Sequence, residues 1–117
     1  MAVKSKVGTA LKIINSSAST NATVVKSSAG NLYSISAMNT SASAKFVRIY
    51  NKTTTPTVGT DVPIIVVAIP ATSSKEITYT PGLRISSGIG VAITGGAAAT
   101  DNTAVADGDV QLLVSFA

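Results

Sequence analysis

The stretch KFVRIYNKTTTPTVGTDVPIIVVAIP, from Lys45 to Pro70, decides the fold that this sequence predicts. It opens with the densest run of β-forming residues in the chain, passes through a Thr-, Pro- and Gly-rich turn, and ends in the apolar run from Ile64 to Ile69. Prolines bound this second run, which is too short for a helix. We therefore predict two core strands joined by an ordered connection, the second covered on both faces.

In the first of these strands the side chains alternate between two faces. Val47 and Ile49 share one face, whereas Phe46, Arg48 and Tyr50 share the other. Arg48 interrupts that second face. We expect its stem to cover apolar surface with the guanidinium at the sheet edge, or to pair with an acid of a neighbouring chain.

Short β-type segments continue on both sides of this stretch, separated by turn residues. They span residues 11–15, 22–28, 31–39, 76–80, 83–86, 88–94 and 109–117. A hairpin is expected around Gly30, and a turn at Pro81-Gly82. Gly90 and Ala92 leave one side of their strand so small that we expect another backbone or sheet to approach it closely. The predicted fold is all-β, an antiparallel, jelly-roll-like β-sandwich with seven or eight short strands.

A length of 117 residues suits one domain, which we place at residues 11–117 behind an N-terminal arm at residues 1–10. Charged residues make up 12% of the chain, about half the usual share, and a surface so lightly charged is often covered by neighbours. No apolar run is long enough for a membrane helix, and the N-terminus lacks the pattern of a signal peptide. We expect neither membrane association nor signal-directed secretion.

The net charge of +4 is unevenly distributed along the chain. Most of the lysines, including Lys4, Lys6 and Lys12, precede the first acid, Asp61. This arrangement suits docking on an acidic surface or head-to-tail contact between copies. Nucleic acid is a weaker candidate, because Val47 and Ile49 are plain core residues beside the aromatic side chains that would stack on bases. We expect no nucleic-acid partner.

The chain has no histidine and no cysteine, which removes the usual catalytic triads and most metal ligands. Glycoside cleavage needs two acids that converge in a cleft, and Glu76 is the best candidate among the five acids of the chain. Four residues, Asp101, Asn102, Asp107 and Asp109, offer oxygens to a calcium ion without matching the spacing of a calcium loop, and turn formation explains them as well. We predict no enzyme activity, no cofactor and no metal.

Two longer patterns resemble a group of small virion structural proteins of tailed bacteriophages. The first pattern, FVRIYNK followed by PTVGTDVP, spans Phe46–Lys52 and Pro56–Pro63. The second, GIGVAITGGAAATDNTAVADGDV, spans Gly88–Val110. The resemblance covers about the last two-thirds of the chain, including its Gly, Pro and Asp punctuation.

The resemblance implies a capsid decoration or cement protein that binds assembled coat protein and stabilises the phage head. It would be made in the host cytoplasm and carried on the capsid surface as a homo-oligomer, with a trimer as the natural guess for local three-fold axes. The expected partner contacts are Lys4, Lys6, Lys12, Arg48, Asp101 and Asn102. The alternative is a carbohydrate-binding or host-adhesion domain of a virion fibre or tail, although such modules usually present aromatic platforms that are scarce here.

Overall fold

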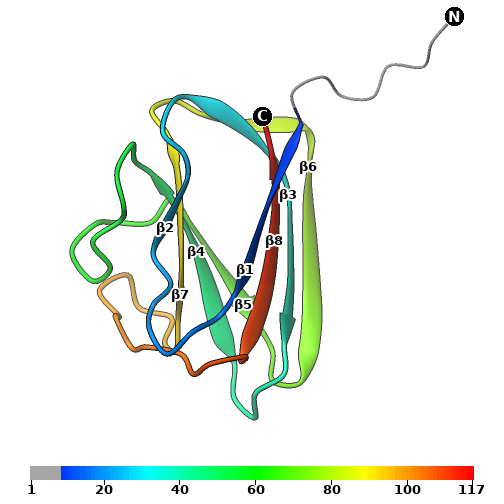
Figure 1. The fold of residues 1–117 in the computed structure, drawn as a ribbon, viewed down its shortest axis with the longest axis vertical. Coiled ribbons are helices and arrows are strands. Elements are labelled where there is room, and N and C mark those ends of the chain that lie inside the picture. Colours follow the sequence, from blue (N-terminus) through cyan, green and yellow to red (C-terminus); the bar gives the residue numbers. More distant parts are fainter. Residues whose placement is uncertain (1–8) are drawn as a thin grey trace, which may run out of the picture.

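A computed structural model describes residues 9–117, which form two four-stranded antiparallel sheets packed face to face (Figure 1). The strands are β1 (Ala10–Asn15), β2 (Thr23–Lys26), β3 (Gly30–Asn39), β4 (Lys45–Asn51), β5 (Ile65–Ile69), β6 (Ser73–Ile85), β7 (Ile89–Thr94) and β8 (Val110–Phe116). Their order is β1-β8-β3-β6 in one sheet and β2-β7-β4-β5 in the other, which is the jelly-roll arrangement. This confirms the predicted fold class. Within residues 9–117 no helix has the length and hydropathy to cross a membrane.

The core lies between the two sheets and is built from alternate residues of their strands. Val47 and Ile49 of β4 are fully buried in it, as predicted. β8 lies between β1 and β3 and directs Val110, Leu112 and Val114 into the same core. The alternation of apolar residues in the sequence therefore identified the inward side of these strands correctly.

Only one pair of consecutive strands in the described chain forms a hairpin within a sheet. That pair is β4 and β5, the two strands of the stretch that begins at Lys45, with Val47 opposite Val67. Every other connection between consecutive strands crosses from one sheet to the other. The hairpin predicted around Gly30 is therefore wrong, because β2 pairs with β7 while β3 pairs with β6 and β8.

β5 is not covered on both faces, contrary to the prediction. It is the edge strand of its sheet, so Val67 and Ile69 are buried while Val66 and Ala68 are exposed. A continuous apolar run resembles a doubly buried strand, and the sequence does not reveal that this one lies at an edge.

The predicted turn at Pro81-Gly82 is also wrong, because both residues lie inside β6. β6 is the outer strand of its sheet, and its pairing with β3 shifts register between Leu32 and Ser34, opposite the segment that holds the proline. A proline at such an irregularity in an edge strand interrupts few ladder hydrogen bonds. The strand can therefore continue through a dipeptide that normally marks a turn.

Candidate interaction surfaces

The outward side of β4 and β7, the two inner strands of the β2-β7-β4-β5 sheet, is covered by two of the protein's own loops. We call it the covered face: Phe46, Arg48 and Tyr50 of β4 with Gly90, Ala92 and Thr94 of β7. The β4–β5 loop (residues 52–64) and the β7–β8 loop (residues 95–109) lie against this sheet on the left of Figure 1. Except for Phe46, these residues are buried although they point away from the core.

Arg48 fastens the β7–β8 loop to the covered face. Its Nε donates to Thr94 Oγ1 at 2.7 Å, and its Nη2 donates to the carbonyl oxygens of Gly96 and Ala98, both at 2.7 Å. The side chain is completely buried. Charge-assisted hydrogen bonds to carbonyl oxygens offset the desolvation of the guanidinium, whose planar fork bridges two loop carbonyls at once.

The expectation that Arg48 lies at a sheet edge or reaches a neighbouring chain is therefore wrong. β4 is an inner strand, flanked by β7 and β5, and the β7–β8 loop closes over the guanidinium. The residue has an internal role, which is to hold a loop whose residues are mostly small.

The β4–β5 loop packs on the covered face through a close approach at Gly90. A Cβ atom added to Gly90 would lie 2.7 Å from Pro56 Cγ, so the proline occupies the space that the glycine leaves. The small side of this strand is therefore closely approached, as predicted, but by the side chain of a loop proline and not by a second sheet. Tyr50 is buried beside it, and its hydroxyl has no hydrogen-bond partner among residues 9–117. Burial raises the pKa of Tyr50, against the lowering effect of the nearby Arg48 guanidinium.

Carboxylates order both loops. Asp61 pairs with Lys52 and accepts a hydrogen bond from the Thr57 amide at 2.7 Å, and these contacts lower its pKa. Asp101 accepts hydrogen bonds from the Gly96 amide at 2.9 Å and from Thr103 Oγ1 at 2.8 Å. Desolvation acts to raise the pKa of Asp101, but its hydrogen bonds and the charge of the guanidinium hold it below the ordinary value.

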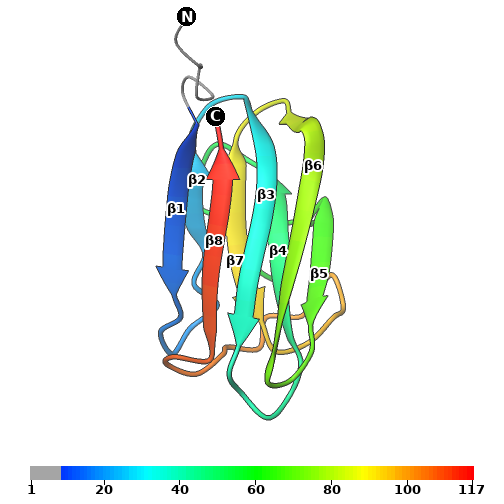
Figure 2. The ribbon, with the colours of Figure 1, turned by 90° about the vertical axis from the view of Figure 1, so that its right-hand side faces the viewer.

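Within residues 9–117, no loop covers the outward side of the other sheet, as Figure 2 shows with β1, β8, β3 and β6 in front. We call it the bare face. It consists of three cross-strand rows, each with one residue from β1, β8, β3 and β6 in turn. The rows are Asn15, Gln111, Met38, Ser74; Ile13, Leu113, Ser36, Glu76; and Leu11, Ser115, Ser34, Thr78.

Large apolar side chains are exposed on the bare face. Leu11 is 63% exposed, Ile13 57% and Met38 53%. In these rows only Glu76 carries a charge, and none of the residues is aromatic. Apolar side chains clustered on one face with so little charge indicate a surface that another molecule covers.

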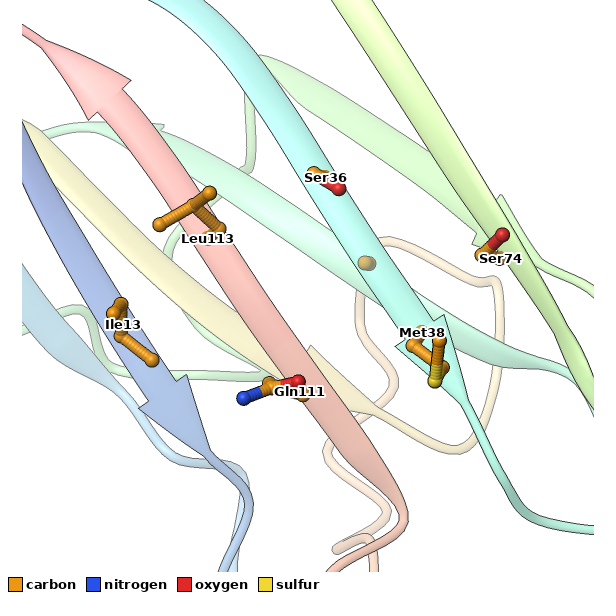
Figure 3. Close-up of a pocket in the computed structure, with 7 residues that line it drawn as sticks. Ile13, Ser36, Met38, Ser74, Gln111 and Leu113 are labelled. Carbon is orange, nitrogen blue, oxygen red and sulfur yellow. The ribbon is translucent and has the colours of Figure 1, made fainter.

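A shallow hollow of about 330 Å³ lies between the first two rows of the bare face (Figure 3). Ile13 and Leu113 stand on one side of it and Met38 on another, while Ser36 and Ser74 leave the space between them. The hollow exists because small side chains occur beside large ones in neighbouring rows.

A second group of exposed apolar side chains follows the sheet edge at β5. Val62, Ile64 and Val66 alternate with Pro63 and Ile65 and are all exposed. No charged residue occurs from Val62 to Ser74, so the edge lacks the lysines that commonly protect free strands. We call Val62, Ile64 and Val66 the β5 stripe.

The predicted partner-contact residues other than Arg48 lie in different parts of the chain. Lys4 and Lys6 lie outside the described residues. Lys12 is half-buried on the inward side of β1, opposite Val114. Asp101 orders its own loop, and Asn102 lies against the β4–β5 loop, where its Cβ is 3.3 Å from the position of a Cβ added to Gly59. Their contact with a partner stays a prediction.

The amino-acid sequence does not reveal the bare face or the β5 stripe. In β1 both alternate positions carry apolar residues, so the pattern does not tell whether Leu11 and Ile13 or their neighbours face outward. Met38 offered a signal, because it is the large apolar residue on the Ser34 and Ser36 side of an alternating strand.

No protein-family model matches this chain, and no curated protein matches it. Among solved structures, the Tobacco streak virus coat protein is similar with a TM-score of 0.45 and 8% sequence identity. That alignment covers 99% of this chain and 90% of the coat protein. These values are too low to indicate a shared function.

Proposed function

We propose that this protein is a virion structural protein, a decoration or cement protein that binds assembled coat protein and stabilises the head of a tailed bacteriophage. The observation that carries the proposal is the bare face, an open sheet side with exposed Leu11, Ile13 and Met38 and almost no charge. The sequence resemblance to small phage virion proteins supports the same conclusion. A protein of this kind works by covering area and needs no catalytic group.

The size of the bare face favours binding to a repeating surface. Four strands about 4.8 Å apart and rows covering about five residues give a flat area on the order of 350 Å². Stable pairwise complexes bury about 800 Å² on each partner. One copy would thus bind one soluble coat subunit weakly, whereas linked copies on an assembled shell would bind strongly through multivalency.

We assign the contact between copies to the β5 stripe. An uncharged free edge strand pairs readily with another strand, so we expect a neighbouring copy to shield it in the assembled protein. A homo-oligomer, with a trimer as the working hypothesis, would cover Ile64 and Val66 and leave the bare face for the coat protein. Lys4, Lys6 and Lys12 would add contacts to acidic coat surface.

Co-sedimentation with empty, expanded capsids tests the proposal. Purified protein should pellet with the shells and raise the temperature at which they disrupt, and free coat subunits should not retain it. Absence of the protein from the pellet at micromolar concentration would contradict the proposed function.

The copy contact has its own test. Val66→Lys should lower the mass measured by light scattering to that of a monomer, because a charge on the edge opposes strand pairing. Thr78→Lys, an exposed position of the bare face, is the matched control and should leave the mass unchanged. An oligomer that survives Val66→Lys would contradict the assignment to β5.

A further inference from the structure

The residues that line the hollow in the bare face suit the binding of one apolar side chain. Its walls are the hydrocarbon side chains of Ile13 and Leu113 and the flexible thioether of Met38. Ser36, Ser74 and the amide of Gln111 supply polar groups on its other sides. None of the residues from 9 to 117 that line it is charged, so they offer nothing to neutralise a phosphate, a carboxylate or a metal ion.

The shape of the hollow also favours a side chain over a free small molecule. Small-ligand sites enclose most of the surface of their ligand, whereas this hollow of about 330 Å³ is shallow and open to solvent. Such depressions at the centre of an interface commonly receive the anchor residue that contributes most of the binding energy.

The charge of the surrounding rows indicates what the partner surface must carry. Glu76 follows Ser36 in the same cross-strand row and is exposed. In the three rows it is the one charge, so an approaching surface needs a neutral, apolar centre and a cation beside it. A second copy docked row on row about Ser36 would set Glu76 against its own counterpart, which disfavours self-association here.

We infer that the hollow is the recognition site for the coat protein and receives one protruding apolar side chain of a coat subunit, with a coat lysine or arginine opposite Glu76. The inference rests on the proposed function and names the element that gives it specificity. The remainder of the bare face then supplies complementarity around this anchor.

Two substitutions on the same strand and face distinguish the contribution of the hollow to binding from that of the surface around it. Ser36→Leu fills the hollow, whereas Ser34→Leu adds the same side chain one row away. We expect Ser36→Leu to weaken binding to expanded shells at least tenfold and Ser34→Leu to change it less than threefold. Thermal unfolding of both variants, measured in parallel, establishes that each is folded.

The other outcomes are equally informative. Equal loss in the two variants would mean that the flat face matters and the hollow does not, which would overturn the inference. Unchanged binding of Ser36→Leu would overturn it as well, while the proposed function would stand. Failure of the unmodified protein to bind shells would instead remove the proposed function itself.

The inferred cation is tested separately through Glu76. Glu76→Lys should weaken shell binding more than Lys75→Glu, its exposed neighbour outside the three rows. The loss should be larger at low ionic strength, where charge repulsion is less screened. Equal effects of the two variants would contradict a cation opposite Glu76.

Discussion

The outward sides of the two sheets differ in how they are covered. The covered face places Arg48, Tyr50 and Gly90 under two loops, so that its outward residues behave as a second core. The bare face exposes Leu11 and Ile13, and no loop of residues 9–117 lies above them. Both faces belong to one small domain. The difference supports our proposal that the first is completed by the chain itself and the second by another molecule.

The largest effect is expected where the covering loop is fastened. Arg48→Met should lower the free energy of unfolding by about 3 kcal/mol or more, because loop carbonyls lose their donors in a buried place. Chemical denaturation measures this. Arg84→Met, an exposed arginine of β6, should change stability by less than about 0.5 kcal/mol. Similar values for both variants would contradict an internal role for Arg48.

The next effect concerns the contact of the β4–β5 loop with the sheet. Gly90→Ala places a Cβ where Pro56 lies, and overpacking of this kind costs about 1–3 kcal/mol. The expected result is a lower denaturant midpoint with an unchanged slope. The double variant Gly90→Ala, Pro56→Ala should recover part of the loss. No recovery would show that Pro56 is not the obstacle.

Substitution of Tyr50 should have a smaller effect on stability, and of the opposite sign. Its buried hydroxyl has no hydrogen-bond partner within the described chain, so Tyr50→Phe removes an unsatisfied group. Stability should stay the same or rise by up to about 1 kcal/mol in thermal unfolding. A loss greater than about 1 kcal/mol would mean that the hydroxyl is bonded.

The covered face should also weaken in acid. The folded-state pKa of Asp101 is lowered, so the folded protein releases its proton more readily than the unfolded chain. The stability it contributes is complete above the ordinary value of 3.8 and is lost as pH falls through the lower folded value. Denaturation from pH 7 to pH 3 should show a shallower decline for Asp101→Asn. Asp107→Asn, exposed in the same loop, is the control.

The smallest change in stability is expected on the bare face. Ile13→Lys should alter the free energy of unfolding by less than about 0.5 kcal/mol, because the side chain is already exposed. The same substitution should abolish binding to expanded shells. A marked loss of stability would show that Ile13 serves the fold of the isolated chain.

Some strand pairings of this fold could be predicted from the sequence and others could not. The β4–β5 hairpin was predictable because its two strands are neighbours in the chain and pair directly. The pairing around Gly30 was not, because a jelly roll sends consecutive strands to opposite sheets, and local turn signals carry no information about that choice. Gly90 predicted a close contact on its side of the strand. It did not predict that Pro56 would make that contact.

The candidate surface was the least predictable part. Alternation separates the two sides of a strand but does not say whether the second side meets loops, a partner or water. Arg48 and Ile13 illustrate the limit, since the charged residue is buried and the apolar residue is exposed. Only the course of the loops from residues 52–64 and 95–109 distinguishes the two faces.

Oxidative footprinting of Met38 on intact particles tests the central claim most directly. Met38 stands at the hollow in the bare face and is more than half exposed in the isolated chain. Hydroxyl radicals should oxidise it readily in free protein and much more slowly on particles, while the outer loops at residues 52–64 and 95–109 keep their reactivity. Protection of those loops with undiminished oxidation of Met38 would contradict the account.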